Sequence, residues 1–338
     1  MVRRVSGLLC VTLAAVVAWS AGSAGSADAA PGARLKQFRV PTADSQPRAI
    51  TNGVDGNRWF TEGTDSTNAP PTLARIMPAG AVTEFPVDAA SGCNVCILTD
   101  IAQTPSGVLY LTSNDAHLVR FDIATLSFLA PVQMPNTSAL GGNLATHGDT
   151  VWVTDFNNDR VWRYTISIGA FTFVPATDPT DVAVDADGNA WFTESGDVSA
   201  PGSSAIGRID AVTGAVTRTA TTAGSTTVVP NQITVATDGQ VWFTARFTPQ
   251  AVGRLNPTGS SLTLFPLSGV GPGGIAASPD GSVWFTQVTA GNIANITNTG
   301  AITEGKAVKG SGPFGVTVAA NAQPWYTMMS ADRIGTLQ

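Results

Sequence analysis

Charged residues are scarce in this chain. Only 12% of its 338 residues are Asp, Glu, Lys or Arg, against roughly 25% in typical soluble domains. Long helices depend on Glu, Lys, Arg and Leu, and the 35 glycines and 21 prolines would interrupt them. A mainly helical protein is therefore excluded. Disorder is excluded as well, because eight Trp, three Tyr and 14 Phe can build a hydrophobic core.

Histidine and cysteine are also scarce, with two and three residues respectively. The two histidines do not have the spacing of a metal-binding pair, and no nucleophilic triad is signalled. Cys93 and Cys96 form a C-x-x-C motif. In an oxidising compartment this spacing predicts a small disulfide that fixes a loop. The alternative is a redox motif, which would require a βα unit that the sequence does not indicate.

Long apolar runs are missing outside the N-terminus. Arg3 and Arg4 precede a mostly apolar stretch, Val5 to Trp19, and the cleavage signal Ala27-Asp28-Ala29 follows. This pattern predicts a secretory signal peptide over residues 1–29 and a secreted protein exported by the bacterial Sec route. The apolar stretch is too short to span a bilayer. The net charge of −6 disfavours nucleic acid and anionic membranes as partners.

An aromatic residue recurs every 40 to 50 residues or so, about the length of one propeller blade. A proline or leucine stands twelve positions before each of these aromatic anchors. The anchors are Trp59, Tyr110, Trp152, Trp191, Trp242, Trp284 and Trp325.

Each repeat has the pattern of four strands. In the fourth repeat, Asp181 to Val184 alternates apolar residues and Asp187-Gly188 has the composition of a tight hairpin turn. Trp191 begins the next strand, Ile206 to Ile209 forms a third, and Gly214 to Thr217 leads into a fourth. Seven such repeats predict an all-β, seven-bladed β-propeller of four-stranded blades, occupying residues 30–338 as one domain.

The two ends of the chain predict how this ring closes. The sequence stops after a third-strand motif, Ile334 to Leu337, so the last repeat lacks its own fourth strand. Leu35 to Pro41 resembles a fourth strand and should complete the last blade. The alternative is an open β-solenoid, which would need capping repeats. We expect the closed ring, and we expect it to be a monomer.

The repeated motifs resemble those of the virginiamycin B lyase (streptogramin B lyase) family. They are P-x-x-I, D-G-x-x-W-F-T-E as in Asp187 to Glu194, I-G-R-I as in Ile206 to Ile209, and T-E-F-P as in Thr83 to Pro86. The resemblance covers nearly the whole chain after the signal peptide. It implies a seven-bladed propeller and, in the lyase, a Mg²⁺-assisted elimination that opens a cyclic depsipeptide at its ester.

The positions that carry this chemistry in the family are occupied by other residues here. The two lyase histidines correspond to Gly273 and Phe314, and acidic residues correspond to Gly312 and approximately to Met329. Ester elimination needs a base and an acid or metal, which these side chains cannot provide. We therefore expect a ligand- or partner-binding protein. The alternative is an enzyme, either an active C–O lyase or a metal-dependent hydrolase or lactonase.

Acidic side chains are the candidates for a metal site. We expect two positions of each blade to face the central channel, one in the first strand and one at the end of the second. Carboxylates at these positions could hold Ca²⁺ or Mg²⁺ through oxygen ligands. The alternative is that they cap backbone N–H groups. The five candidates are Glu62, Asp100, Asp155, Asp181 and Glu194.

The same face is expected to carry the ligand-binding groups. Gln232 and Gln287 occupy channel positions in later blades, and His117 begins a third strand at the rim. Long loops at residues 63–72 and 195–204 fall on this face, where a rigid scaffold usually binds its partners. A small molecule, a glycan or a protein would fit this surface, and the alternative is that the loops have no function. No cofactor is required by any motif.

Overall fold

The computed structural model describes residues 27–28, 34–63, 70–91, 93, 96–135, 142–196, 203–223, 226–247, 249–258, 261–306 and 308–338. Most of the predicted signal peptide and most of the two long loops lie outside these residues. In the described part of the chain, no helix is long and apolar enough to cross a membrane.

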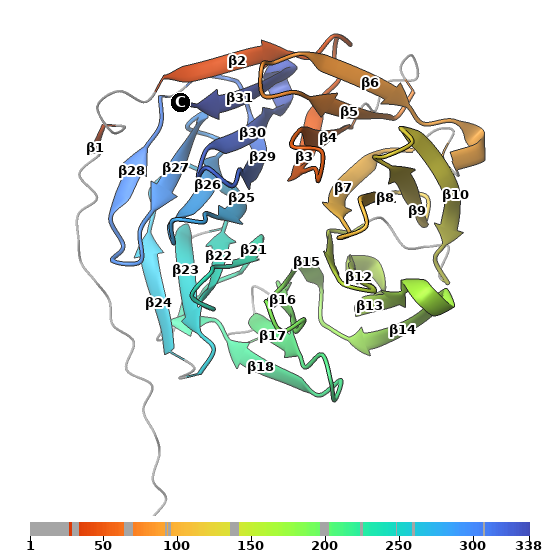
Figure 1. The fold of residues 1–338 in the computed structure, drawn as a ribbon. Coiled ribbons are helices and arrows are strands. Elements are labelled where there is room, and N and C mark those ends of the chain that lie inside the picture. The colour runs from red at the N-terminus through yellow and green to blue at the C-terminus, as the bar shows by residue number, and fades with distance from the viewer. Residues whose placement is uncertain are drawn as a thin grey trace, which may run out of the picture.

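Seven four-stranded antiparallel sheets surround a central axis (Figure 1), which confirms the predicted propeller. Within each blade the strands follow one another from the axis outward. Blade 1 contains β3 (Pro47–Asn52), β4 (Arg58–Glu62), β5 (Thr72–Ile76) and β6 (Val82–Pro86). Blade 2 contains β7 (Leu98–Gln103), β8 (Val108–Ser113), β9 (His117–Asp122) and β10 (Ser127–Gln133). Blade 3 contains β11 (Leu144–His147), β12 (Thr150–Asp155), β13 (Arg160–Thr165) and β14 (Ala170–Pro175).

The remaining blades repeat this arrangement. Blade 4 contains β15 (Pro179–Val184), β16 (Ala190–Glu194), β17 (Ala205–Ile209) and β18 (Val216–Ala220). Blade 5 contains β21 (Ile233–Val235), β22 (Val241–Ala245), β23 (Ala251–Asn256) and β24 (Ser261–Pro266). Blade 6 contains β25 (Pro272–Ala277), β26 (Val283–Gln287), β27 (Asn292–Ile296) and β28 (Ile302–Glu304). Blade 7 contains β29 (Pro313–Val318), β30 (Pro324–Met328), β31 (Arg333–Leu337) and β2 (Leu35–Arg39).

A few short elements lie outside this scheme. Strand β1 (Ala27–Asp28) pairs in parallel with β28, and β19 (Thr222–Ala223) forms a small hairpin with β20 (Thr226–Thr227) between blades 4 and 5. Four single-turn 3₁₀ helices occur in connections: η1 (Ala89–Ser91), η2 (Phe156–Asn158), η3 (Ile166–Ile168) and η4 (Met329–Ala331).

The N-terminal strand closes the ring, as the sequence predicts. Strand β2 pairs with β31 in antiparallel register from Leu35 opposite Leu337 to Arg39 opposite Arg333. Figure 1 shows β2 at the outer edge of blade 7, beside the C-terminal strand. Both ends of the domain are therefore held in one sheet, where β2 covers the outer edge of β31.

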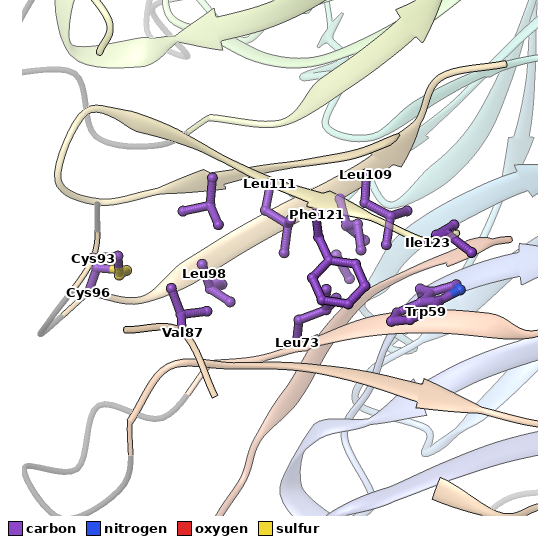
Figure 2. Close-up of a cluster of buried hydrophobic side chains, with 13 residues drawn as sticks. Trp59, Leu73, Val87, Cys93, Cys96, Leu98, Leu109, Leu111, Phe121 and Ile123 are labelled. Atoms are coloured by element: carbon purple, nitrogen blue, oxygen red, sulfur yellow. A yellow bond between two sulfur atoms is a disulfide. The ribbon is translucent and has the colours of Figure 1, made fainter. Parts of the chain in front are cut away.

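The hydrophobic core lies between adjacent blades. Between blades 1 and 2 the Trp59 indole packs against Phe121, with ring centroids 5.2 Å apart, among buried leucines (Figure 2). Cys93 and Cys96 form a disulfide at the edge of this cluster, with their Cα atoms 5.7 Å apart. Each interface contains a similar cluster, so the core is a ring of interfaces.

A buried threonine joins each blade to the next. The residue two positions after each anchor is Thr, and all seven are at most 1% exposed. In blade 7, Thr327 Oγ1 accepts a hydrogen bond from Gly315 N at 2.8 Å and donates one to the Arg48 carbonyl of blade 1 at 2.6 Å. Six of the seven hydroxyls donate to the following blade in this way, at 2.6–3.4 Å.

Irregular innermost strands create the need for these hydroxyls. In blade 4 the pairing of β15 with β16 shifts register between Pro179 and Val182. A bulge of this kind leaves backbone groups without a ladder partner, and buried backbone groups must be paired. Thr193 Oγ1 accepts the freed Asp181 N–H at 2.9 Å and also lies 2.9 Å from the Asn231 carbonyl of blade 5.

Replacing Thr327 with Val should destabilise the protein by about 1–3 kcal/mol, because two buried backbone groups lose the hydroxyl. Denaturant unfolding of wild type and T327V measures this. The matched control is Thr172→Val on the outermost strand of blade 3, where the side chain is exposed and the change should stay within about 0.5 kcal/mol. Equal effects of both substitutions would contradict the role given to Thr327.

Candidate functional site

A cavity of about 300 Å³ lies on the propeller axis. The innermost strands of all seven blades contribute to its wall, at the face where these strands begin. In blades 1, 2, 4, 6 and 7 these residues lie at a register shift between the first and second strands, which turns side chains toward the axis. This cavity is therefore the site at which all blades can contact one ligand.

One half of the cavity wall is polar. Asp100, Asn143, Asp181 and Gln232 line it from blades 2, 3, 4 and 5, and Arg246 lies at the same wall. The sequence predicted that Asp100, Asp181 and Gln232 face the channel, and they do. The polar half combines carboxyl, amide and guanidinium groups, which can hold a small polar ligand by hydrogen bonds.

Asp100 and Asp181 also join neighbouring blades. Asp100 Oδ2 accepts a hydrogen bond from Leu144 N of blade 3 at 2.7 Å. Asp181 Oδ2 accepts one from Ile233 N of blade 5 at 2.7 Å, and its Oδ1 accepts from Val182 N at 2.8 Å. These contacts are the backbone-capping arrangement that the sequence analysis gave as the alternative to metal binding.

Burial disfavours ionisation of both carboxyl groups. It raises the pKa of Asp100 to about 7, although backbone N–H donors act against the shift. Burial and the nearby charge of Asp100 raise the pKa of Asp181 well above its ordinary value, against the hydrogen bonds from Ile233, Val182 and Asn143. Asp100 can therefore act as a hydrogen-bond donor as well as an acceptor near pH 7.

The other half of the wall is small and apolar. A Cβ atom on Gly274 would lie 2.4 Å from the Phe314 carbonyl oxygen, and one on Gly315 would lie 2.4 Å from the Arg48 carbonyl oxygen. Glycine is therefore required where the innermost strands of blades 6, 7 and 1 approach one another. The narrow contact leaves the polar half as the side with room for ligand groups.

Three of the four positions aligned with lyase residues line this cavity. Gly273, Phe314 and Met329 lie in its wall, and Gly312 does not. A Cβ atom on Gly273 would lie 2.7 Å from Thr286 Oγ1 and 3.0 Å from a Val288 methyl carbon, so a larger side chain would have to displace both. These positions offer no side-chain oxygen or imidazole ligand, so this donor set does not fit Mg²⁺.

The second set of predicted channel residues lies elsewhere, which corrects the sequence interpretation. Glu62, Asp155, Glu194 and Gln287 are at most 2% exposed, and none of them lines the axial cavity. They end the second strand of their blades, one strand away from the axis. Side chains stand perpendicular to a sheet, so from this strand they point into the blade or its junction with the preceding blade.

Their contacts are local. Asp155 accepts hydrogen bonds from Asn158 Nδ2 at 2.8 Å and Trp162 Nε1 at 3.0 Å. Glu194 accepts one from Thr177 N at 2.8 Å and pairs with Arg218 at 2.8 Å. Within the described ranges, the five predicted acidic residues form no group of three with ligand atoms within 4.8 Å of one another. Metal binding by individual members stays a prediction.

Asn143 is a site residue that the sequence analysis missed. Counting from the anchor places Gly142 at the channel position of blade 3. However, the β11–β12 turn is one residue shorter than its counterpart in blade 4. The strand register shows this: the residue after the anchor pairs with Leu144 in blade 3 (Val153) and with Val182 in blade 4 (Phe192), so Leu144 is the equivalent of Val182. The register therefore shifts by one residue. The Thr154 hydroxyl accepts a hydrogen bond from Asn143 N at 3.0 Å, as Thr193 accepts one from Asp181 N in blade 4. Asn143 is therefore the channel residue of blade 3.

His117 is placed away from the cavity. It begins β9, is half-buried, and its Nδ1 lies 3.4 Å from Asp115 Oδ1. Asp115 also lies near Cys93 and Cys96, but the disulfide removes both thiolates as metal ligands. This region is a rim cluster, separate from the axial site.

Equivalent positions in three blades hold three different pairs. Each pair joins the last residue of the second strand to a residue of the fourth strand. In blade 4 the pair is Glu194 with Arg218. In blade 6 it is Gln287 with Glu304, and Gln287 Nε2 donates to the Glu304 carboxyl group at 3.3 Å. In blade 1 the pair is Glu62 with Glu84, both acidic. Neither oxygen of Glu62 accepts a hydrogen bond from a described residue. Burial and then Glu84 raise the pKa of Glu62 to about 9.

Comparison with known proteins agrees with this architecture. The profile of the virginiamycin B lyase family matches residues 27–218 and 145–338. A streptogramin B lyase structure superposes with a TM-score of 0.77 at 23% identity, covering 92% of this chain and 99% of the other. Virginiamycin B lyase from Staphylococcus aureus gives 0.77 at 22% identity, with 90% and 99% coverage.

A catalytically inactive His-to-Ala variant of the Staphylococcus aureus enzyme, solved with quinupristin, gives a TM-score of 0.75 at 22% identity and the same coverage. These superpositions show that the fold is shared, and at identities this low they show the fold alone. No curated protein sequence matches this chain.

Replacing Glu62 with Gln should stabilise the protein increasingly as the pH rises. In the folded protein the pKa of Glu62 is about 9, whereas the ordinary pKa of a glutamate is 4.5. The raised folded-state pKa means that wild type loses stability between these values, by about 1.4 kcal/mol per pH unit for one proton. Glutamine stays neutral, so the stability difference between E62Q and wild type should be small near pH 4.5 and increase toward pH 9 in denaturant unfolding.

The matched control creates the same acidic pair in blade 6. Gln287→Glu places a carboxyl beside Glu304, so the free energy of unfolding of this variant should fall with rising pH more steeply than that of wild type. If E62Q and wild type keep a constant stability difference across this range, Glu62 is already ionised in the folded protein.

Proposed function

Because the chain belongs to the virginiamycin B lyase family, we propose that it is a secreted propeller of this family that binds a small polar ligand at the axial cavity without the family's elimination reaction. The observation that carries the proposal is the cavity wall itself. Gly273, Phe314 and Met329 stand where a base, a metal ligand or an acid would have to act. None of these side chains can transfer a proton or bind a hard cation.

Binding is supported by the polar half of the same cavity. Asp100 can both donate and accept near neutral pH because burial raises its pKa to about 7, and burial raises the pKa of Asp181 as well. Asn143 and Gln232 add amide groups, and Arg246 adds a positive charge. A volume of about 300 Å³ corresponds to a small ligand or to one group of a larger one.

The purified protein should leave quinupristin intact in the presence of Mg²⁺. Virginiamycin B lyase from Staphylococcus aureus serves as the positive control, and mass spectrometry detects opening of the depsipeptide ring. Ring opening that the protein catalyses, and that stops when a chelator removes Mg²⁺, would overturn the proposal. Binding without opening, measured by calorimetry and weakened in Asp181→Asn, would identify quinupristin itself as a ligand.

Export should remove the first 29 residues. N-terminal sequencing of the protein recovered outside the bacterial cytoplasm is expected to begin at Ala30, because Ala27 and Ala29 provide the small residues that signal peptidase requires. Ala29→Phe should block cleavage and leave the signal peptide attached, whereas Asp28→Asn should be processed normally. Retention of the wild-type protein in the cytoplasm with residues 1–29 intact would refute secretion.

A further inference from the structure

A cavity of about 610 Å³ lies between blades 6 and 7, away from the axial site. It is lined by the anchor Trp284, by Ala322 of the turn between β29 and β30, and by Pro324, the first residue of β30. That turn is at the opposite end of the strands from the axial cavity, so the two cavities open on different faces. The site is therefore independent of the proposed function.

Five of the other blades cover their anchors with arginine. The residue paired with the anchor on the third strand is Arg75 in blade 1, Arg163 in blade 3, Arg208 in blade 4 and Arg254 in blade 5. Each guanidinium carbon lies 5.4–5.7 Å from the indole centroid of its own anchor. In blade 7, Arg58 of blade 1 covers Trp325 at 5.8 Å. The fold itself thus shows that this face of an anchor tryptophan receives a guanidinium.

Blade 6 lacks this arginine. Its third-strand residue opposite Trp284 is Asn295, whose Nδ2 donates to Ser282 Oγ at 2.7 Å. Among the described residues no Lys or Arg side chain covers the Trp284 ring, and none lines the cavity. Trp284 is accordingly only partly buried, whereas the six other anchors are at most 5% exposed.

The aromatic cover of the anchor is missing as well. Phe85, Phe265 and Phe38 of the fourth strands pack on the anchors of blades 1, 5 and 7, with centroids 5.5–5.7 Å apart. In blade 6 the corresponding residue is Gly305, whose N–H donates to the Ile293 carbonyl at 2.8 Å. The two substitutions together, Asn for Arg and Gly for Phe, open the cavity over the indole.

Amide groups lie beside Trp284 in the cavity wall, where Gln323 and Gln338 contribute from blade 7. Glu304 also lines the cavity, but its side chain points to the opposite face of blade 6, where its carboxyl group accepts from Gln287 at 3.3 Å. The preference of this cavity for a cation therefore comes from the indole face alone, which binds an organic cation better than a neutral ligand of the same shape.

We propose that this cavity binds the guanidinium group of an external ligand, which takes the place over Trp284 that an internal arginine occupies in five other blades. The volume is larger than a guanidinium alone requires, so a whole arginine or an arginine side chain of a partner protein can enter. Both sources present the same chemistry to Trp284.

Calorimetric titration with arginine and with citrulline tests the proposal, because citrulline has nearly the same shape without the charge. Both ligands are used as free amino acids and with acetyl and amide caps. We expect the arginine form to bind about fivefold or more tightly than the citrulline form. Preference for the capped ligand would assign the site to a partner protein, and equal binding of free and capped arginine would assign it to a small molecule. Equal affinity for arginine and citrulline would overturn the proposal.

The decisive variant fills the cavity from within. Asn295→Arg restores the cross-strand pair of blades 1, 3, 4 and 5, so it should preserve or raise the melting temperature while weakening arginine binding about tenfold or more. Asn295→Gln keeps an amide at this position and should still bind. Because N295R is expected to remain folded, unchanged arginine binding by this variant would show that the ligand binds elsewhere and would refute the site.

Discussion

The hydroxyl of one threonine in each blade is the contact on which the rest of this propeller depends. In five blades it accepts a backbone N–H bond from the start of the innermost strand of its own blade, and in six it donates one to the same region of the next blade. The hydrophobic clusters between blades are not directional. The threonine hydrogen bonds are directional, so they determine how close the innermost strands come and therefore the width of the channel.

This constraint has consequences for the axial cavity. The start of each innermost strand presents a residue to the axis, and the identity of that residue determines the local chemistry. Blades 2 to 5 place Asp100, Asn143, Asp181 and Gln232 there, whereas Gly274 and Gly315 allow blades 6 and 7 to approach closely. The result is an asymmetric cavity in a nearly symmetric ring. The family's reaction positions fall on the narrow side, where proton-transferring side chains are missing.

Repetition also shows where the molecule departs from its own pattern. Equivalent positions pair Glu194 with Arg218, Gln287 with Glu304, and Glu62 with Glu84. The last pair is compatible with burial only if one carboxyl keeps its proton. In the same way, an uncovered Trp284 is meaningful because other anchors are covered by arginine. Each blade thus serves as an internal reference for the chemistry of the others.

The sequence by itself determined the architecture, because the aromatic anchor recurs seven times, Asp-Gly turns precede four of the anchors, and a fourth-strand pattern stands at Leu35, ahead of the first repeat. It also placed Asp100, Asp181 and Gln232 at the axis and Gly273, Phe314 and Met329 at the positions aligned with lyase residues. Only the tertiary structure decided which side chains meet. Glu62 and Glu194 point into blade junctions because strand pleat directs them there. A turn shortened by one residue puts Asn143 in place of Gly142, and the open face of Trp284 depends on two residues from different strands.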